Sequence, residues 1–267
     1  MTTTSNPSLS PVLITGGCGL IGFHLVNYIL ESEPTCKIHV LDINTTNVTY
    51  HTCDITSLSG VESVMLQAQP RTIFHVACPD SMVLQPSVFQ EVNVNGAQNL
   101  ISAAFKVGTI QAFVNTSTSS VIHDNISDLI DADEDLPVLQ YPAQKRVYTL
   151  TKAVAEADIL AANRKYGDSS MLTVSFRPTT AFGERDTICK NEYDFIYVGN
   201  LAEAHILAAQ ALLRAYGKPV PPLETRVDGQ TFNITNDERI LFWEFQRRIS
   251  AAIGFPIKEE DIKIIPK

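Results

Sequence analysis

The stretch VLITGGCGLIG, residues 12–22, decides the fold of this chain. Its first four residues, 12–15, are apolar or β-branched and predict a buried strand. Four glycines follow within seven positions, and residues 20–30 then carry apolar side chains at helical spacing. A strand, a glycine turn and a helix in this order are the context that a dinucleotide-binding loop requires. Glycine also marks ordinary turns and helix caps, so the loop alone does not establish the site.

Three of the glycines have separate physical tasks in such a loop. Gly16 permits the tight turn, and Gly19 lets the backbone approach a pyrophosphate without an intervening Cβ. Gly22 lets the helix pack closely on the strand. The free N–H groups at the start of the helix, at Leu20 and Ile21, then face the phosphates.

An acidic residue is expected about 20 positions after the loop, where it holds the ribose hydroxyls. Asp42 stands there, at the end of a strand predicted over residues 37–41. Its carboxylate would repel a 2′-phosphate, so the sequence favours NAD over NADP as the cofactor. Asp54, after the next strand, is expected to reach the adenine amino group or else to cap the following helix. Further cofactor contacts are expected from residues at strand ends, namely Ile55, Ala77 and Pro178.

Composition narrows the class of protein. The 267 residues are 45% hydrophobic, and the formal net charge of −9 is spread without a basic stripe. Nucleic-acid and anionic-membrane partners are therefore disfavoured. Five cysteines without a Cys-x-x-Cys pair predict reduced, buried thiols in a cytoplasmic protein, with neither a disulfide frame nor a metal site. The opening eleven residues lack the apolar core of a signal peptide, and no apolar run reaches the roughly 18 residues of a membrane span.

Strands and helices alternate along the chain, which predicts an α/β fold of the Rossmann type with a doubly wound parallel sheet. Beyond the first strand and helix, the predicted strands cover residues 37–41, 48–53, 72–77, 110–116, 171–176, 193–198 and 230–234. The predicted helices cover residues 58–67, 89–105, 142–166, 201–216 and 241–253. We assign residues 1–178 to a nucleotide-binding domain, onto which 193–216 packs back. Residues 179–192 and 217–267 are expected to form a small substrate-binding lobe.

Tyr148 and Lys152 are the candidate catalytic pair. They are four positions apart in a predicted helix, so their side chains lie on one face, about 5–6 Å apart. An ammonium beside a phenol is expected to lower its pKa from about 10 toward the working range of a base. Tyr141 and Lys145 repeat the spacing, but Pro142 places Tyr141 at or before the start of the helix. We therefore favour the second pair.

A hydroxyl donor should stand beside the tyrosine, at the carboxyl end of the preceding strand, to hold the oxygen of a substrate. Residues 116–120 (TSTSS) offer five candidates, and any of them can instead be a cap or a loop residue.

Several phrases together resemble the extended short-chain dehydrogenases, and most closely their 3β-hydroxysteroid dehydrogenase family. They are TGGCGLIG, HVACP, NVNGAQNLI, NTSTSSVI, YTLTKAVAEA, RPTTAFGERD and YDFIYVGNLAEAH. Within the family, the chain is most similar to the fungal branch that acts on 4α-carboxysterols. The resemblance covers nearly the whole chain and places the catalytic hydroxyl on Thr118, with Ser117 as the alternative.

The resemblance implies an enzyme of sterol biosynthesis. It would oxidise the 3β-hydroxyl of a 4α-carboxysterol to the ketone with NAD, and the C4 carboxylate would leave as carbon dioxide. Contact with the cytosolic face of the endoplasmic reticulum and a homodimer are further implications. A nucleotide-sugar epimerase, another hydroxyl dehydrogenase with the same triad and a non-catalytic dinucleotide sensor are the alternatives.

One departure from the family concerns the substrate lobe. Residues 186–192 (DTICKNE) form a short connector where the family inserts a few tens of residues. Cofactor binding does not depend on this segment, whereas closure over a substrate does.

Overall fold

The computed structural model describes residues 6–43, 50–81, 83–127, 129, 131–184, 195–236, 240, 242–252, 254 and 256. Its strands are β1 (Val12–Thr15), β2 (Ile38–Asp42), β3 (Tyr50–Thr52), β4 (Thr72–His75), β5 (Ala112–Thr116), β6 (Leu172–Pro178), β7 (Thr180–Phe182), β8 (Phe195–Tyr197) and β9 (Thr231–Ile234). Its α-helices are α1 (Leu20–Ser32), α2 (Leu58–Ala68), α3 (Pro86–Phe89), α4 (Gly96–Val107), α5 (Val147–Ala161), α6 (Val198–Ala215) and α7 (Phe242–Ala252). A π-helical segment covers Gln90–Asn95, and 3₁₀ turns cover Ser119–Ile122 and Leu223–Thr225.

Seven parallel strands form the main sheet, in the order β3-β2-β1-β4-β5-β6-β9. Thr15 of β1 pairs with Leu41 of β2 on one side and with His75 of β4 on the other. The strand order therefore reverses between β1 and β4, which is where open parallel sheets bind their ligands. The glycine loop follows β1 at this reversal, so the predicted doubly wound sheet is confirmed.

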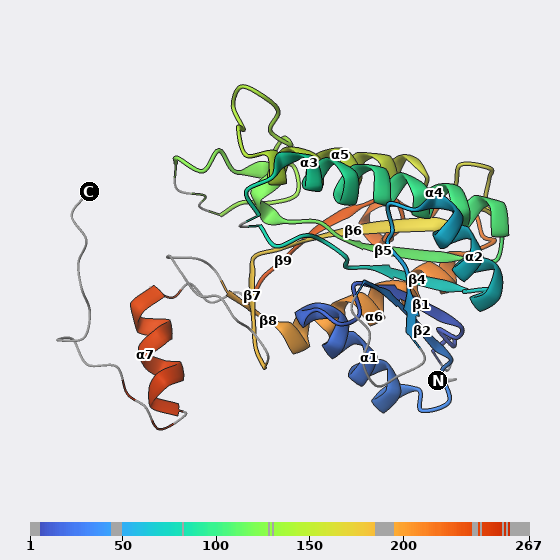
Figure 1. Cartoon of the computed structure of the whole chain (residues 1–267), viewed down its shortest axis with the longest axis horizontal. Helices are drawn as coiled ribbons and strands as arrows, with labels where there is room; N and C mark the ends of the chain where they lie inside the picture. The colour runs from blue at the N-terminus through green and yellow to red at the C-terminus, as the bar shows by residue number, and fades with distance from the viewer. Residues whose placement is uncertain are drawn as a thin grey trace.

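Helices cover both faces of the sheet (Figure 1). Helices α1 and α6 pack against each other on one face, and α2, α4 and α5 form a row on the other. Alternate residues of β1 serve the two layers, because successive side chains of a strand point to opposite faces. Val12 and Ile14 pack with α1 and α6, whereas Leu13 packs with the second layer.

Helix α5 begins at Val147, five residues later than the predicted start at residue 142. The side chain of Gln144 explains the delay. Its carbonyl oxygen accepts hydrogen bonds from the main-chain N–H groups of Lys145 and Arg146, at 2.9 and 2.8 Å. Its amide nitrogen donates to the carbonyl oxygen of His123 at 2.6 Å. The main-chain N–H groups just before the helix thus bond to a side chain instead of to helical carbonyl groups. Tyr148 becomes the second helical residue.

Strand β9 comes from the region that the sequence assigned to the substrate lobe, and it instead completes the main sheet. Its Thr231 pairs with Ser175 of β6, and Phe232 packs edge-on against Phe176 with ring centroids 6.1 Å apart. The pairing gives β6 a neighbour on its outer side. Residues 180–182 and 195–197 form a separate two-stranded parallel sheet, β7-β8, next to α7 (Figure 1).

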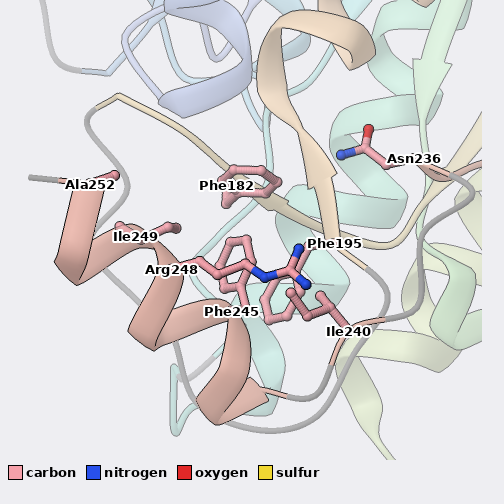
Figure 2. Close-up of a pocket in the computed structure, with 8 residues that line it drawn as sticks. All are labelled: Phe182, Phe195, Asn236, Ile240, Phe245, Arg248, Ile249 and Ala252. Carbon is pink, nitrogen blue, oxygen red and sulfur yellow. The ribbon is translucent and has the colours of Figure 1, made fainter. Parts of the chain in front are cut away.

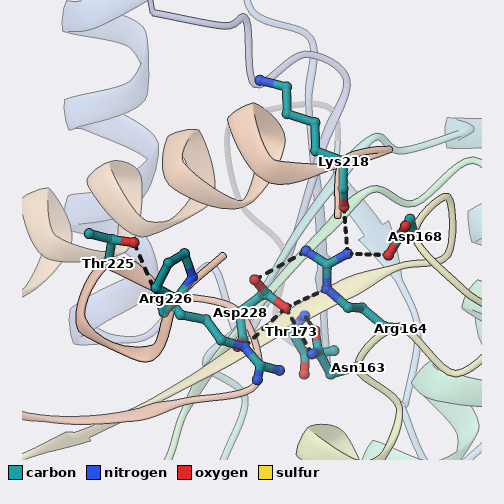
Figure 3. A network of polar contacts seen from close by, with 9 residues as sticks. Asn163, Arg164, Asp168, Thr173, Lys218, Thr225, Arg226 and Asp228 are labelled. Atoms are coloured by element: carbon teal, nitrogen blue, oxygen red, sulfur yellow. Dashed lines mark hydrogen bonds and ion pairs between the residues drawn. The ribbon is translucent and has the colours of Figure 1, made fainter. Parts of the chain in front are cut away.

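A buried carboxylate ties the end of α5 to the segment before β9 (Figure 3). Asp228 is 1% exposed and accepts hydrogen bonds from Arg164 Nε at 2.7 Å and from Asn163 Nδ2 at 3.0 Å. The same guanidinium donates from Nη1 to Asp168 and to the carbonyl oxygen of Lys218. The network therefore fixes the position of the chain that enters β9.

Candidate active site

The glycine loop has the shape that the sequence predicts. Gly16 has a φ of +73°, and a Cβ added to it would lie 2.6 Å from the Cα of Ala77. A Cβ on Gly22 would lie 2.3 Å from the carbonyl oxygen of Gly16, so this glycine permits close packing of α1 on the loop itself. A Cβ on Gly19 would meet only that same oxygen, at 3.4 Å, and the space around it is otherwise open. Gly16 and Gly22 are closed to side chains by neighbouring main-chain atoms, whereas the exposed Gly19 leaves room for a ligand.

Helix α1 begins with no side-chain cap. Gly19 is its N-cap residue and makes no side-chain hydrogen bond. The first N–H groups of a helix have no partner within the helix, and together with the helix dipole they favour an anion. The described residues thus fit the pyrophosphate of a dinucleotide at Gly19, Leu20 and Ile21.

The carboxylate of Asp42 lies against the loop. Its Oδ2 accepts a hydrogen bond from the main-chain N–H of Cys18 at 2.9 Å. The aspartate at the end of β2 is therefore held beside the start of α1, as a ribose-binding carboxylate must be.

The other predicted cofactor residues differ in what their side chains do. Asp54 is exposed and accepts a hydrogen bond from Thr56 N at 2.9 Å, while Ser57 caps α2. The expected capping role of Asp54 is therefore wrong, and its carboxylate closes a local turn. Ile55 is 5% exposed and packs in the core, so its side chain is not a surface contact. Ala77 lies at Gly16, and Pro178 is buried at the carboxyl end of β6.

Tyr148 stands in the first turn of α5, where it packs edge-on against Phe89 with centroids 5.7 Å apart. Its hydroxyl is close enough to Thr118 and Cys78 for hydrogen bonding to both to affect its pKa. Tyr141, the alternative, lies outside the helix and is 75% exposed. The structure thus brings Tyr148 and Thr118 together, as the sequence predicts.

The pKa of Tyr148 shifts in the direction opposite to the prediction. Burial raises the pKa of Tyr148 above its ordinary value near 10, and a negative charge on Cys78 would raise it further. A hydrogen bond from Thr118 and the charge of Arg146 act in the opposite sense without offsetting burial. The predicted lowering by the ammonium of Lys152 is therefore wrong for the protein alone.

The amine of Lys152 is engaged elsewhere. Lys152 is 4% exposed, and its Nζ donates to the carbonyl oxygen of Thr116 at 2.6 Å. Its positive charge lowers the pKa of His75, whose burial has the larger effect and brings the pKa to about 3. Lys152 thus stands at the carboxyl ends of β4 and β5, one helical turn from Tyr148.

Three of the five candidate hydroxyls differ in their hydrogen-bond partners. Thr116 Oγ1 bonds to His205 Nε2 at 2.7 Å, and Ser117 Oγ is buried without a hydrogen-bond partner. Thr118 caps the 3₁₀ turn by accepting from Ser120 N at 3.2 Å, and of the two favoured residues it is the one beside Tyr148. Thr118 is therefore the better candidate for the substrate-binding hydroxyl.

Cys78 is a site residue that the sequence did not indicate. It was expected to be buried, yet it is exposed, and its thiol donates to Asn93 Oδ1 at 3.3 Å. Asn93 lies in the π-helical segment and donates to Thr151 of α5 at 3.1 Å, so its amide links two helices. The position of Cys78 just after a buried strand was the available signal, because parallel strands end at the ligand edge.

An apolar cavity of about 270 Å³ lies between β7, β8 and α7 (Figure 2). The rings of Phe195 and Phe245 stack there at 3.9 Å, and Phe182 meets Phe245 edge-on at 4.7 Å. Asn236 and Arg248 supply polar groups at its edge (Figure 2). Asn236 follows β9, so the cavity lies on the carboxyl side of the sheet, as does Tyr148.

The described part of the chain contains neither a metal site nor a membrane-spanning helix. Among these residues, no group of three or more histidine, cysteine or acidic side chains could hold a metal ion. Within the same ranges, no helix has the length and apolar character needed to cross a membrane.

Solved structures share the fold. The UDP-glucose 4-epimerase of Thermus thermophilus in complex with NAD matches 92% of this chain and 84% of its own, with a TM-score of 0.73 and 24% identity. A dTDP-glucose 4,6-dehydratase from Bacillus anthracis, also with NAD, matches 96% and 84%, with a TM-score of 0.74 and 20% identity. At this level of identity the likeness shows the fold alone.

Relatives found by sequence have higher identity to this chain than these two solved structures. The decarboxylating sterol-4-alpha-carboxylate 3-dehydrogenase of Saccharomyces cerevisiae is 32% identical over 279 positions, which cover 92% of this chain and 76% of the relative. The corresponding Bos taurus protein is 29% identical and covers 93% and 71%. Both alignments span more positions than this chain has residues, so these relatives carry residues within the matched region that this chain lacks.

The family model matches in two overlapping parts, residues 13–194 and 187–264. The two parts meet at the short connector, residues 186–192, which lies outside the described residues. Together they span most of the 267 residues. The chain belongs to the 3-beta hydroxysteroid dehydrogenase/isomerase family.

Proposed function

We propose that this protein is an NAD-dependent dehydrogenase that oxidises the 3β-hydroxyl of a 4α-carboxysterol and releases the C4 carboxylate as carbon dioxide. The placement of the Tyr148 hydroxyl beside Thr118, at the ligand edge of the sheet, carries the proposal. Family membership and the names of the relatives support this substrate class.

The cofactor is assigned to the glycine loop. Gly16, Gly19 and the first turn of α1 would hold the pyrophosphate, and Asp42 would hold the adenosine ribose. Bound NAD supplies the acceptor for the hydride that leaves C3 of the sterol.

The chain's own residues handle the proton and the substrate oxygen. Tyr148, in its phenolate form, takes the proton of the 3β-hydroxyl, while Thr118 donates a hydrogen bond to the same oxygen. Lys152, one helical turn from Tyr148 on α5, would hold the nicotinamide ribose.

The same groups serve the decarboxylation. The 3-ketone is β to the C4 carboxylate, so the bond from C4 to the carboxylate carbon can break with its electron pair passing to the ketone oxygen. The hydroxyls of Tyr148 and Thr118 stabilise the charge that develops on that oxygen. Protonation at C4 then completes the ketone product, and no metal is required.

Charges in the C-terminal region favour an apolar substrate over a nucleotide sugar. A diphosphate needs cationic partners, and three arginines of this region already bind protein groups. Arg214 donates to Asn6, Arg226 to the carbonyl oxygen of Asp228, and Arg248 pairs with Glu244 at 2.6 Å. We infer that the aromatic cavity beside α7 receives the apolar part of the sterol.

Turnover of a 4α-carboxysterol with NAD tests the proposal. Mass spectrometry should find a 3-ketone that has lost carbon dioxide, with one NADH formed for each ketone. Tyr148→Phe should lower turnover by at least about 10²-fold. Tyr141→Phe is the matched control, because this exposed tyrosine of the alternative pair lies outside the helix.

Three outcomes would count against the proposal. Full turnover by Tyr148→Phe would remove the proposed base. Conversion of a UDP-sugar but not of the sterol would favour the epimerase reading. NAD binding without turnover of either substrate would favour a dinucleotide sensor.

A further inference from the structure

Two buried charges of opposite sign lie one helical turn apart on α5 yet bind different partners. Lys152 is 4% exposed and Glu156 is 2% exposed. Side chains at this spacing are neighbours on a helix, and a lysine and a glutamate there attract each other. Burial strengthens the attraction, because the local dielectric constant is low.

The guanidinium of Arg177, on β6, pairs with the carboxylate of Glu156. Its Nε donates to both carboxylate oxygens, at 3.1 and 3.2 Å, and its Nη2 donates to Oε1 at 2.6 Å. Ser175 adds a longer contact to Oε2 at 3.4 Å. The planar guanidinium thus takes both oxygens at once, as it does in bidentate pairs.

Arg177 pairs with Glu156 although one of its own nitrogens has no hydrogen-bond partner. Arg177 is 4% exposed, and its Nη1 is buried without a hydrogen-bond partner. A buried unpaired donor opposes folding. Three hydrogen bonds from the guanidinium of Arg177 go to the carboxylate of Glu156, and these bonds account for the position of the arginine.

We propose that Arg177 is a positioning residue for Lys152, because it holds the carboxylate of Glu156 away from the lysine's ammonium. Without Arg177, the buried carboxylate would be unpaired and Lys152 would be the nearest cation on the same helix face. The ammonium would turn toward Glu156 and would no longer point at the carboxyl ends of β4 and β5. The inference rests on the proposed function for the assignment of Lys152 to the nicotinamide ribose.

Three variants test this role through the dissociation constant for NAD, measured by isothermal titration calorimetry. Arg177→Met should weaken NAD binding at least about tenfold, which corresponds to one lost hydrogen bond from a charged donor. The double variant Glu156→Gln/Arg177→Met removes the competing carboxylate and should bind NAD within about threefold of the wild type. Glu156→Gln alone should also stay within about threefold.

The double variant separates positioning from a purely structural role. Circular dichroism and thermal unfolding report the folded fraction, and affinity is taken per folded protein. If Arg177→Met does not fold, Arg177→Gln replaces it, because an amide still donates to the carboxylate without neutralising it. Wild-type affinity in the Arg177 variant, or equal weakening in the double variant, would overturn the inference.

The measurement needs no sterol, so the two proposals fail separately. A wild-type protein that binds NAD but does not oxidise a 4α-carboxysterol would overturn the proposed substrate and leave this inference standing. A wild-type protein that does not bind NAD would overturn both.

Discussion

The side-chain nitrogen of Lys152 lies 2.6 Å from the main-chain carbonyl oxygen of Thr116. Thr116 is the last residue of β5, and Thr118 follows two positions later. One buried hydrogen bond therefore joins the helix that carries Tyr148 to the strand that leads into its hydroxyl partner, Thr118. Lysine has a structural task here as well as the proposed contact with the cofactor.

Lys152→Met should lower the free energy of unfolding by about 1–3 kcal/mol even without NAD, since the buried carbonyl of Thr116 loses its charged donor. Urea unfolding of the ligand-free protein measures the change. Lys145→Met is the control, because Lys145 is the exposed lysine of the alternative pair and should change stability by less than about 0.5 kcal/mol. Equal stability of the Lys152 variant and the wild type would mean that the bond contributes nothing.

The pH dependence of oxidation should reflect the raised pKa of Tyr148. Burial keeps the phenol protonated at neutral pH, so the fraction of phenolate grows about tenfold for each pH unit below the pKa. The kcat/KM for the sterol should therefore still be rising between pH 7 and 9, since this constant reports groups of the free enzyme. Initial rates of NADH formation across this range measure it, and a profile already flat at pH 7 would show that the phenol ionises more easily.

Replacement of Thr118 should affect the reaction far more than replacement of its neighbour. Thr118→Val removes the hydroxyl beside Tyr148 and should lower kcat by about 10²-fold, as loss of one oxyanion donor does. Thr118→Ser keeps the hydroxyl and should retain most of the activity. Ser117→Ala is the control, because Ser117 Oγ has no hydrogen-bond partner. A larger loss in the Ser117 variant would transfer the role to that residue.

A pair of glycine variants separates backbone strain from steric exclusion in the cofactor loop. Gly16 and Gly108 share a φ of +73°, but a Cβ on Gly16 would lie 2.6 Å from the Cα of Ala77, whereas a Cβ on Gly108 would meet nothing within 4 Å. Gly108→Ala should cost about 1 kcal/mol of stability from strain alone. Gly16→Ala should cost about 1–3 kcal/mol more and should weaken NAD binding. Chemical unfolding and NAD titration measure both effects, and equal costs would show that the loop can relax.

Asp228→Asn should destabilise the protein by about 3 kcal/mol at pH 7, because it removes one partner of a buried ion pair. Burial by itself would raise the pKa of Asp228, but hydrogen bonds from Arg164 and Asn163 and the charge of Arg164 lower it overall. The stabilisation is therefore present above about pH 4, the value for an unfolded aspartate, and is lost as the pH falls through the lower folded value.

The difference between Asp228→Asn and the wild type should accordingly shrink at acidic pH, and urea unfolding at several pH values measures it. Asp168→Asn is the control, since Asp168 contacts the same arginine but its side chain is 50% exposed, and its loss should cost less than about 1 kcal/mol. A difference that stayed constant down to pH 3 would contradict the assignment of the effect to the ionised carboxylate.

Local patterns predicted the parts of the site that depend on nearby residues. The order of strand, glycines and helix at residues 12–32 and the spacing of Tyr148 and Lys152 depend on short-range geometry, and the structure has both. Thr118 was favoured by resemblance and lies beside the tyrosine.

Features set by distant partners were missed. Strand β9 joins the sheet because β6 offers it an edge, which no pattern within residues 230–234 reveals. The pKa of Tyr148 depends on burial and on where Lys152 finds its acceptor, and both arise only when β5 and α5 meet. The side chain of Asn93, within the π-helical segment, bonds to Thr151 of α5, and no pattern near residue 93 reveals that contact.

The position of β9 has a consequence for the biosynthesis of the chain. Residue 175 pairs with residue 231, so the outer side of β6 has no partner until the ribosome has released the chain beyond residue 234. An unpaired parallel edge in a partly made protein is a template for association with other chains. Fragments that end before β9 should therefore aggregate during expression, whereas those that include it should fold with a complete sheet.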